Sequence, residues 1–297
     1  MNNELNSIER TDMRDLLRLR SVKVKDPAGR EVEILKDREA ITLADEYRCG
    51  VYEVYVEALT SGIYPWRYVR NREILSLEEQ LQLAKSRVVV VGAGGLGGHV
   101  ILLLARLGIG YLVVVDNDVF DETNLNRQAL CSMMALGKSK SEEAVELVGS
   151  INPGVNVIPY QAKLESANAT EILAGAHVVV DALDNVSDRL VLESATKRLG
   201  IPMVHGALAG FEGQLTTIFP EDAGLRHLYR NVAADLNKSK SPESVLGVPT
   251  PTPSIIAGLQ SMEVLKIILK RGRVFRNIML YVDLESGRMN EFVLEKQ

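Results

Sequence analysis

Three short stretches of this chain carry side chains that could bind and activate a nucleotide. The glycine-rich stretch Gly92-Ala-Gly-Gly-Leu-Gly97 follows four consecutive valines. A second stretch runs from Asp116 to Gln128, and Asp181-Ala-Leu-Asp-Asn185 comes later in the chain. Glycines let a backbone approach phosphate closely, and the start of a following helix favours negative charge. Together these stretches predict a nucleotide site.

The glycine pattern by itself leaves the nucleotide open. Gly92, Gly94 and Gly97 fit the G-x-G-x-x-G pattern between a strand and a helix. Asp116, at the end of the next expected strand, could hold ribose hydroxyl groups. NAD, FAD, ATP and AMP all carry ribose and phosphate. An NAD-dependent oxidoreductase is therefore one alternative.

Two cations and a carboxylate favour a triphosphate over a dinucleotide. Arg127 lies in the second stretch, Lys140 ends Gly137-Lys-Ser-Lys140, and Asp184 lies at the tip of a later expected strand. A glycine loop alone handles a pyrophosphate, whereas a triphosphate with Mg²⁺ calls for extra cations and a carboxylate. We therefore expect ATP and Mg²⁺, with Asp184 linked to the metal.

The motifs VVGAGGLGG, DNDVFDETNLNRQ, GKSK and DALDN together resemble the ATP-binding motifs of the ThiF/MoeB/HesA family. These proteins are bacterial relatives of ubiquitin-activating enzymes, and the resemblance runs from about Arg70 to about Glu291. It implies an ATP-dependent adenylyltransferase. The substrate it implies is the C-terminal Gly-Gly carboxylate of a small MoaD- or ThiS-like sulfur-carrier protein.

The resemblance also implies roles for individual residues. It places Gly94 and Gly95 against the nucleotide and Asp116 at the ribose, and it brings Arg72 to the γ-phosphate bound by the partner subunit of a homodimer. The remaining nucleotide-binding residues that it implies are Asn124, Arg127, Gln128, Lys140, Asp184 and Asn185. The expected catalytic set is Arg127, Lys140, Asp184 and Arg72.

The expected chemistry needs positive charge more than it needs a general base. A C-terminal carboxylate is already ionised at neutral pH, so the difficulty is bringing it to an anionic phosphate. Asp184 has a second, structural interpretation as the N-cap of a helix beginning near Ser187. Two alternatives for the whole protein are a catalytically reduced carrier-binding scaffold and an enzyme that adenylates a different carboxylate or amide.

Apart from Mg²⁺, we expect no bound metal, and we expect no chemistry at a cysteine thiol. Many relatives bind zinc through two C-x-x-C pairs, but residues 225–231 read LRHLYRN and no cysteine follows Cys131. Only Cys49 and Cys131 are present, too few for a four-thiolate zinc site. We therefore expect no zinc, and we interpret both cysteines as packing residues.

The composition points to a soluble enzyme of the cytoplasm. The chain has 297 residues and a net charge of −5, which gives a nucleic-acid partner little electrostatic support. The polar start is unlike a signal peptide, and we expect no apolar run to approach the ~20 residues of a membrane span. We expect no membrane association.

The elements that must position these residues alternate between strand and helix from residue 87 onward. This alternation predicts a Rossmann-like, mostly parallel sheet with helices on both faces. Residues 1–64 are expected to form an N-terminal α/β appendage of unknown role, with a hairpin over 21–34 and a helix over 41–61. Residues 65–297 would form the adenylation domain. It includes a long loop over 221–253 that carries Lys238 and Lys240.

Overall fold

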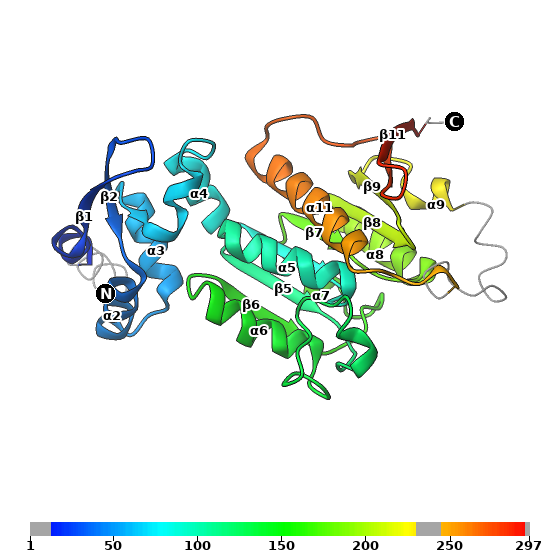
Figure 1. Ribbon diagram of the computed structural model, residues 1–297, viewed down its shortest axis with the longest axis horizontal. Coiled ribbons are helices and arrows are strands. Elements are labelled where there is room, and N and C mark those ends of the chain that lie inside the picture. Colours follow the sequence, from blue (N-terminus) through cyan, green and yellow to red (C-terminus); the bar gives the residue numbers. More distant parts are fainter. Residues whose placement is uncertain (1–12, 230–244, 295–297) are drawn as a thin grey trace.

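An eight-stranded sheet forms the centre of the computed structural model, which describes residues 13–229 and 245–294 (Figure 1). Its strand order is β11-β10-β9-β8-β7-β4-β5-β6. Five neighbouring strands are parallel, namely β4 (Arg87–Val91), β5 (Tyr111–Val115), β6 (Asn156–Tyr160), β7 (Val178–Asp181) and β8 (Met203–Ala209). Three antiparallel strands extend it, namely β9 (Glu212–Ile218), β10 (Ile278–Asp283) and β11 (Arg288–Val293).

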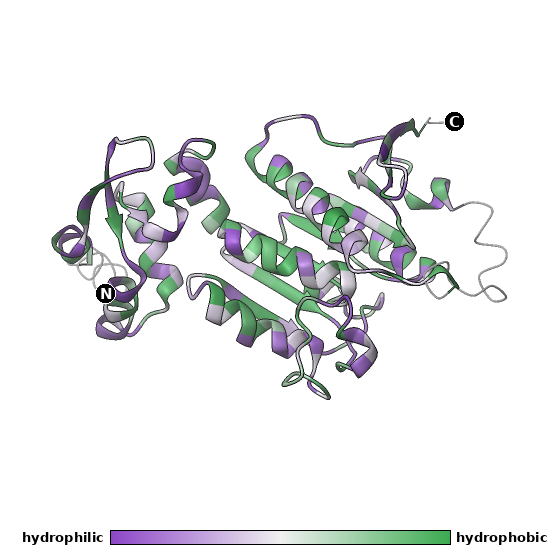
Figure 2. Cartoon of the chain, in the orientation of Figure 1, coloured by the Kyte–Doolittle hydropathy of each residue, from purple (hydrophilic) through white to green (hydrophobic). Residues whose placement is uncertain are grey.

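The central strands are apolar along their whole length because both faces of the sheet are covered. Val88 to Val91 of β4 are all buried, and so are Leu112 to Val115 of β5. β-branched side chains suit such strands, which read as continuous apolar runs rather than as alternating patterns. Figure 2 shows these strands as mostly hydrophobic.

Helices cover the two faces and give two separate cores. One face carries α4 (Leu77–Ala84), α5 (Gly95–Leu107), α6 (Lys140–Ile151) and α11 (Pro251–Leu269). The other carries α7 (Ala169–Leu173), α8 (Val186–Leu199) and α9 (Leu225–Leu228). This three-layer arrangement confirms the expected fold class. Helix α4 was not expected from the sequence, although Ser76 begins it with a capping box that pairs with Glu79.

Helix α11 corrects one expectation. With 19 residues it is long and apolar enough to cross a membrane by length and composition, so the expectation that no segment approaches that length is wrong. In the fold, however, 61% of its apolar 18-residue stretch is buried. It packs against α5, β8 and β9, so its apolar side chains serve the core of the sheet.

The N-terminal region has a small sheet and a core of its own. β1 (Val22–Lys25) and β2 (Glu31–Leu35) form the expected hairpin, and β3 (Tyr64–Pro65) joins β2 in parallel. The expected helix over 41–61 is instead two helices, α2 (Asp37–Tyr47) and α3 (Val51–Thr60). The break follows from the left-handed backbone of Arg48, with φ 51°, and from Gly50.

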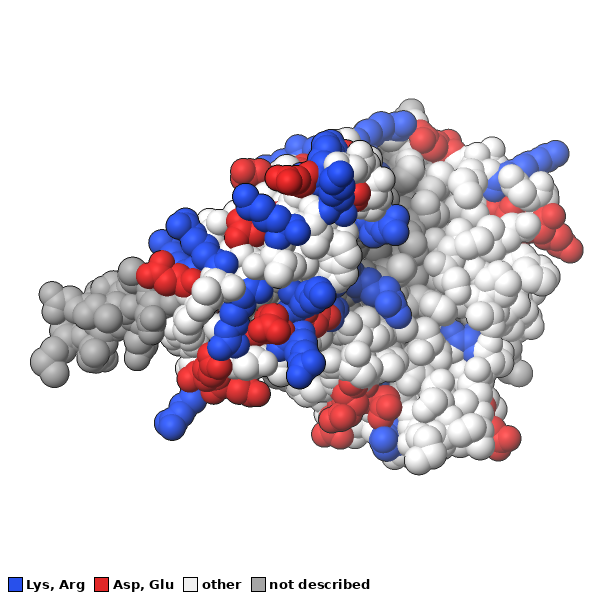
Figure 3. All heavy atoms as spheres, turned by 60° about the vertical axis from the view of Figure 1, so that its left-hand side comes forward, with Lys and Arg blue, Asp and Glu red and all other residues white. Residues whose placement is uncertain are grey.

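The proposed boundary between residues 64 and 65 falls inside β3, and the division into two domains stays a prediction. Figure 3 turns this side of the molecule forward and shows basic and acidic side chains intermixed on it, as is typical of a solvated face. The expected loop residues Lys238 and Lys240 lie outside the described residues.

Arg67 ties the N-terminal region to the sheet domain. It lies in the short 3-10 helix η1 (Trp66–Asn71), donates to the carbonyl of Ile151 at the end of α6 (2.6 Å), and forms an ion pair with Asp37. Burial raises the pKa of Asp37, but hydrogen bonds from Arg67 and Tyr55 and the charge of Arg67 outweigh this effect. The net result is a pKa below its ordinary value of 3.8.

We predict that Asp37→Asn lowers the free energy of unfolding at pH 7 by about 1 kcal/mol. The value is small because the carboxylate is 38% exposed and partly screened by water. A lowered pKa in the folded state means that the carboxylate adds stability above the unfolded value of 3.8 and loses it as the pH falls through the folded value.

Urea unfolding of wild type and variant at a series of pH values checks this prediction. The difference should be fully present at pH 7, begin to shrink near pH 3.8 and vanish only once the pH lies below the lowered pKa of the folded state. Asp45→Asn, at an exposed position of the same helix, should show no difference at any pH. A constant difference for Asp37→Asn across the range would contradict the electrostatic explanation.

Candidate nucleotide-binding site

A pocket of about 680 Å³ lies at the carboxyl ends of β4, β5 and β7. β4 pairs with β5 on one side and with β7 on the other, so the chain turns in opposite directions from this point of the sheet. Ligands of open α/β sheets bind at such a switch in strand order, where the loops diverge. The glycine-rich loop, Asp116, Arg127 and Lys140 all line this pocket.

Two glycines of the loop are required by the protein's own packing. Gly92 has a φ of 96°, and a Cβ atom there would lie 2.5 Å from the carbonyl oxygen of Ala182. A Cβ atom at Gly97 would lie 1.8 Å from the carbonyl oxygen of Gly92. These two positions of the G-x-G-x-x-G pattern are therefore explained without any ligand.

Packing does not require the other two glycines of the loop. A Cβ atom at Gly94 would meet the amide of Gln128 at 3.6 Å, and one at Gly95 would meet Arg127 at 3.6 Å. Both are ordinary contact distances, and both glycines line the pocket. They stand at the start of α5, whose free N–H groups and dipole favour an anion. The bare backbone there is a cradle that fits phosphate.

Asp116 holds the glycine loop in place. Its carboxylate accepts the N–H of Ala93 (2.7 Å) and the N–H of Asp118 (2.8 Å). Burial raises its pKa above 3.8, and these hydrogen bonds together with the charge of Lys140 offset part of that rise. The same carboxylate lines the pocket, as the expected ribose contact requires.

The two expected cations face the pocket from different loops. The side chain of Lys140 is only 8% exposed, and its ammonium group lies 3.0 Å from a carboxylate oxygen of Asp118. Arg127 donates to the Thr123 carbonyl (3.0 Å) and to the Asn126 side chain (2.9 Å) through one nitrogen atom. No described carboxylate forms an ion pair with Arg127, so its remaining donors are available to a phosphate.

Asp184 and Asn185 have distinct positions at the start of α8. Asn185, not Asp184, is the N-cap, because its side chain accepts the N–H of Asp188 (2.9 Å). The structural interpretation of Asp184 as the cap is therefore wrong. Asp184 is exposed in the pocket, where its carboxylate accepts only a hydrogen bond from Asn185 (3.2 Å) among the described contacts.

Of the remaining expected residues, one reaches the pocket and two do not. Gln128 lines it, and its buried side-chain oxygen atom has no hydrogen-bond partner in the described structure. Asn124 is buried and instead completes a capping box with Asp121. Arg72 lies outside the pocket, where it pairs with Asp26 of the same chain at 2.6 Å.

A buried polar chain that the sequence did not suggest supports the loop of Asp184. Burial lowers the pKa of His205 below 6.5, so its ring is neutral at pH 7. Its Nδ1 lies 2.7 Å from the Asp181 carboxylate and its Nε2 lies 3.2 Å from the Tyr229 hydroxyl. Tyr229 also accepts from Gln214 (3.0 Å), which leaves its own proton for His205.

This series of hydrogen-bonded side chains reaches the backbone of Leu183, the residue before Asp184. The carboxylate of Asp181 accepts the N–H of Leu183 (3.0 Å), and Arg189 donates to the Leu183 carbonyl. The loop is thereby held from both sides. The contacts of His205 with Asp181 and Tyr229 join residues 24 positions apart in sequence, so no local sequence pattern marks them.

The described residues offer no preformed metal cage. They contain no group of three or more His, Cys, Asp or Glu side chains placed to hold a metal. A single exposed carboxylate fits Mg²⁺ that arrives with phosphate and water ligands. Burial raises the pKa of Cys131 above 9.0, as suits a packing residue, and the expected lack of zinc stays a prediction.

Relatives of known name match most of the chain. SAMP-activating enzyme E1 of Haloferax volcanii is 40% identical over 207 residues, which cover 69% of this chain and 76% of the relative. Adenylyltransferase and sulfurtransferase MOCS3 of Arabidopsis thaliana is 35% identical over 263 residues, covering 86% of this chain and 56% of the relative. The chain thus spans about three quarters of the first relative and just over half of the second.

Solved structures share the fold. The crystal structure of E. coli MccB with ATP matches with a TM-score of 0.64 at 21% identity. The match covers 78% of this chain and 72% of that chain. A structure of PaaA has a TM-score of 0.62 at 21% identity, covering 83% and 73%. The model of the ThiF family matches residues 68–297, which include the whole described pocket. As its motifs predict, the chain belongs to the ThiF family.

Proposed function

We propose that this protein uses ATP and Mg²⁺ to adenylate the C-terminal carboxylate of a small ubiquitin-like sulfur-carrier protein. The observation that carries the proposal is the combination in one pocket of an open glycine cradle, two cations and an exposed carboxylate. The names of its relatives, an activating enzyme and an adenylyltransferase, support the reaction class.

The geometry suits an attack of one anion on another. A carrier carboxylate oxygen would attack the α-phosphorus of ATP, forming a new P–O bond. The bond between that phosphorus and the bridging oxygen to the β-phosphate breaks, and its electron pair leaves with pyrophosphate. Arg127, Lys140 and the start of α5 would offset the charge that gathers on the phosphates. No described group needs to remove a proton from the nucleophile.

Asp184 would connect the protein to the metal. When bound, Mg²⁺ supplies charge neutralisation and alignment of the phosphate oxygens. The chain's own contribution is to hold the backbone next to Asp184 in place, because Asp181 and Arg189 both form hydrogen bonds with the backbone of Leu183. Asp181, His205 and Arg189 therefore act as positioning residues in this proposal.

A homodimer and a cytoplasmic location belong to the same proposal. The expected action of Arg72 on the nucleotide of the partner subunit requires a second copy, and Arg72 would have to leave its ion pair with Asp26. Sedimentation equilibrium tests the assembly, and a strictly monomeric protein would exclude a shared site. The appendage over residues 1–64 has no role in the reaction as proposed.

We predict that the wild-type protein catalyses ATP–pyrophosphate exchange only when a carrier with a free C-terminal Gly-Gly is present. Asp184→Asn should lower the exchange rate by roughly 100-fold or more, the scale expected for loss of one electrostatic stabiliser, ~2.7–4 kcal/mol. The loss should appear in turnover rather than in apparent affinity. The melting temperature should stay unchanged, because the side chain caps nothing.

Asn185→Ala is the matched control, since it removes the actual N-cap of α8. It should lower stability by about 1 kcal/mol and should leave more exchange activity than Asp184→Asn does. Near-wild-type exchange by Asp184→Asn would contradict its assignment. Exchange with no dependence on a carrier, or no exchange with any carrier, would exclude the proposed reaction.

We predict opposite effects for two substitutions in the glycine loop. Gly95→Ala should keep the melting temperature of wild type but weaken ATP binding by about tenfold or more, because its methyl group occupies the phosphate cradle. Gly97→Ala should lower stability by about 1–3 kcal/mol or prevent folding, because its Cβ would lie 1.8 Å from the Gly92 oxygen.

Thermal melting and calorimetric titration with ATP separate these effects. The described structure gives Gly95→Ala only a 3.6 Å contact with Arg127, so any loss of stability there would show that packing requires this glycine. Unchanged ATP affinity in Gly95→Ala would remove the phosphate cradle from the proposed site.

A further inference from the structure

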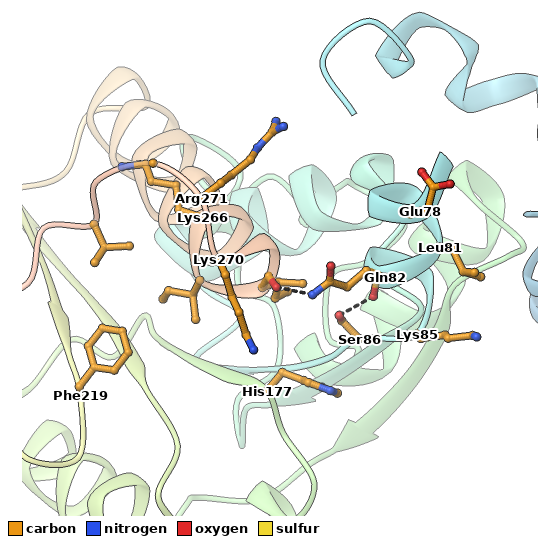
Figure 4. Close-up of a pocket in the computed structure, with 14 residues that line it drawn as sticks. Glu78, Leu81, Gln82, Lys85, Ser86, His177, Phe219, Lys266, Lys270 and Arg271 are labelled. Atoms are coloured by element: carbon orange, nitrogen blue, oxygen red, sulfur yellow. Dashed lines mark hydrogen bonds between the residues drawn. The ribbon is translucent and has the colours of Figure 1, made fainter. Parts of the chain in front are cut away.

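A second pocket, of about 800 Å³, lies at the amino ends of β4 and β7, whereas the nucleotide site lies at their carboxyl ends. It is bounded by α4, by the end of α11 and by the residues that precede β4 and β7. Figure 4 shows Lys270 reaching down from the end of α11, between Phe219 and His177 in this view. Its volume falls in the range of small-molecule sites, ~300–1,000 Å³.

The walls of this pocket are mainly apolar. Leu81, Phe219, Ile267 and Val274 are partly buried side chains that face it from three separate parts of the chain. Two of its uncharged polar side chains, those of Ser86 and Gln82, already donate hydrogen bonds within the protein. Ser86 donates to the carbonyl of Gln82 at 2.7 Å, and the amide of Gln82 donates to the carbonyl of Ile268 at 2.5 Å, as Figure 4 shows.

Basic side chains outnumber acidic ones in the lining of this pocket, although the whole chain carries a net charge of −5. Four basic side chains line the pocket, and two of them are neutralised, Lys266 by Glu263 and Arg271 by Glu79. No described carboxylate pairs with Lys270 or Lys85. The one acidic residue of the lining, Glu78, points away from the Lys270 ammonium in Figure 4.

Lys270 has a backbone conformation that glycine would adopt more easily. It ends α11 with a φ of 51°, in the left-handed region where helices usually place glycine. Glycine comes only two residues later, at Gly272. Arg48 ends α2 in the same conformation, and at both positions glycine would fit the backbone with less strain.

His177 adds a hydrogen-bond donor to the same pocket. Its Nδ1 accepts the backbone N–H of Arg87 at 3.0 Å. In the neutral ring the proton must then be on Nε2, which has no partner among the described residues. The pocket therefore combines apolar walls, an unpaired ammonium group and a neutral donor.

We propose that this pocket binds a small amphipathic organic anion, with an aromatic or aliphatic body against the apolar walls and one carboxylate at Lys270 and His177. The unpaired Lys270 ammonium group selects an anion, and the apolar walls select a ligand with an apolar body. The site is separate from the nucleotide pocket, so it does not depend on the proposed adenylation.

Calorimetric titration of the full-length protein with 2-naphthoate tests this proposal. We expect one site per chain with a dissociation constant on the order of 1 mM or tighter, as a ligand of this size allows. 2-Naphthamide, which has the same shape without the charge, and acetate, which has the charge without the aromatic body, should each bind about fivefold more weakly or not at all. Saturating ATP should leave 2-naphthoate binding unchanged.

Three substitutions at Lys270 separate charge from structure. Lys270→Gln should weaken 2-naphthoate binding about fivefold or more, and Lys270→Arg should retain it. Lys270→Gly should also lose binding, while its melting temperature equals or exceeds that of wild type because the left-handed backbone suits glycine. The control Lys23→Gln, at an exposed position of β1, should bind like wild type.

Three results would overturn the proposal. The first is no saturable binding at concentrations about tenfold above 1 mM. The second is equal binding by wild type, Lys270→Gln and Lys270→Gly, since the ammonium group would then play no part. The third is displacement of 2-naphthoate by ATP, which would place the probe in the nucleotide pocket. None of these measurements uses the exchange reaction.

Discussion

The backbone of Gly92 passes so close to the carbonyl of Ala182 that one added methyl group would lie 2.5 Å from its oxygen. This contact joins the ends of β4 and β7, the two strands between which the chain changes direction. With those ends in contact, the glycine loop and the Asp184 loop line the same pocket. A side chain at position 92 would therefore push the two loops apart.

The carboxylates of Asp116 and Asp181 then fix the loops that this close contact brings together. Asp116, which follows β5, accepts the backbone N–H groups of Ala93 and Asp118. Asp181, the last residue of β7, accepts the N–H of Leu183. Each therefore acts inside the protein, satisfying donors that an irregular loop would otherwise leave unpaired. Asp184 differs because its carboxylate has little to hold within the chain. The acids at the strand ends thus differ: Asp116 and Asp181 hold the loops of the pocket, whereas Asp184 contributes little to holding them.

The sequence predicted the sheet, most of the helices that cover it and most of the residues that line the pocket, because valine runs, glycine spacing and cap residues are local signals. It could not separate Asn185 from Asp184 as the cap, since the two types cap equally well and adjacent positions differ only in backbone geometry. Asn124 and Arg72 were expected at the nucleotide, yet one completes a capping box and the other pairs with Asp26. The hydrogen bonds that link Tyr229 through His205 to Asp181 each join residues 24 positions apart in sequence and leave no local pattern.

Helix α11 also bears on how the chain folds as it is synthesised. Its apolar surface is long enough for a bilayer, and such a segment would be prone to aggregate or to be misdirected if it emerged from the ribosome unprotected. Its partners α4, α5, β7, β8 and β9 all precede it in the sequence. The helix therefore emerges when its binding surface has already been translated, and the order of the elements limits the time for which it stays exposed.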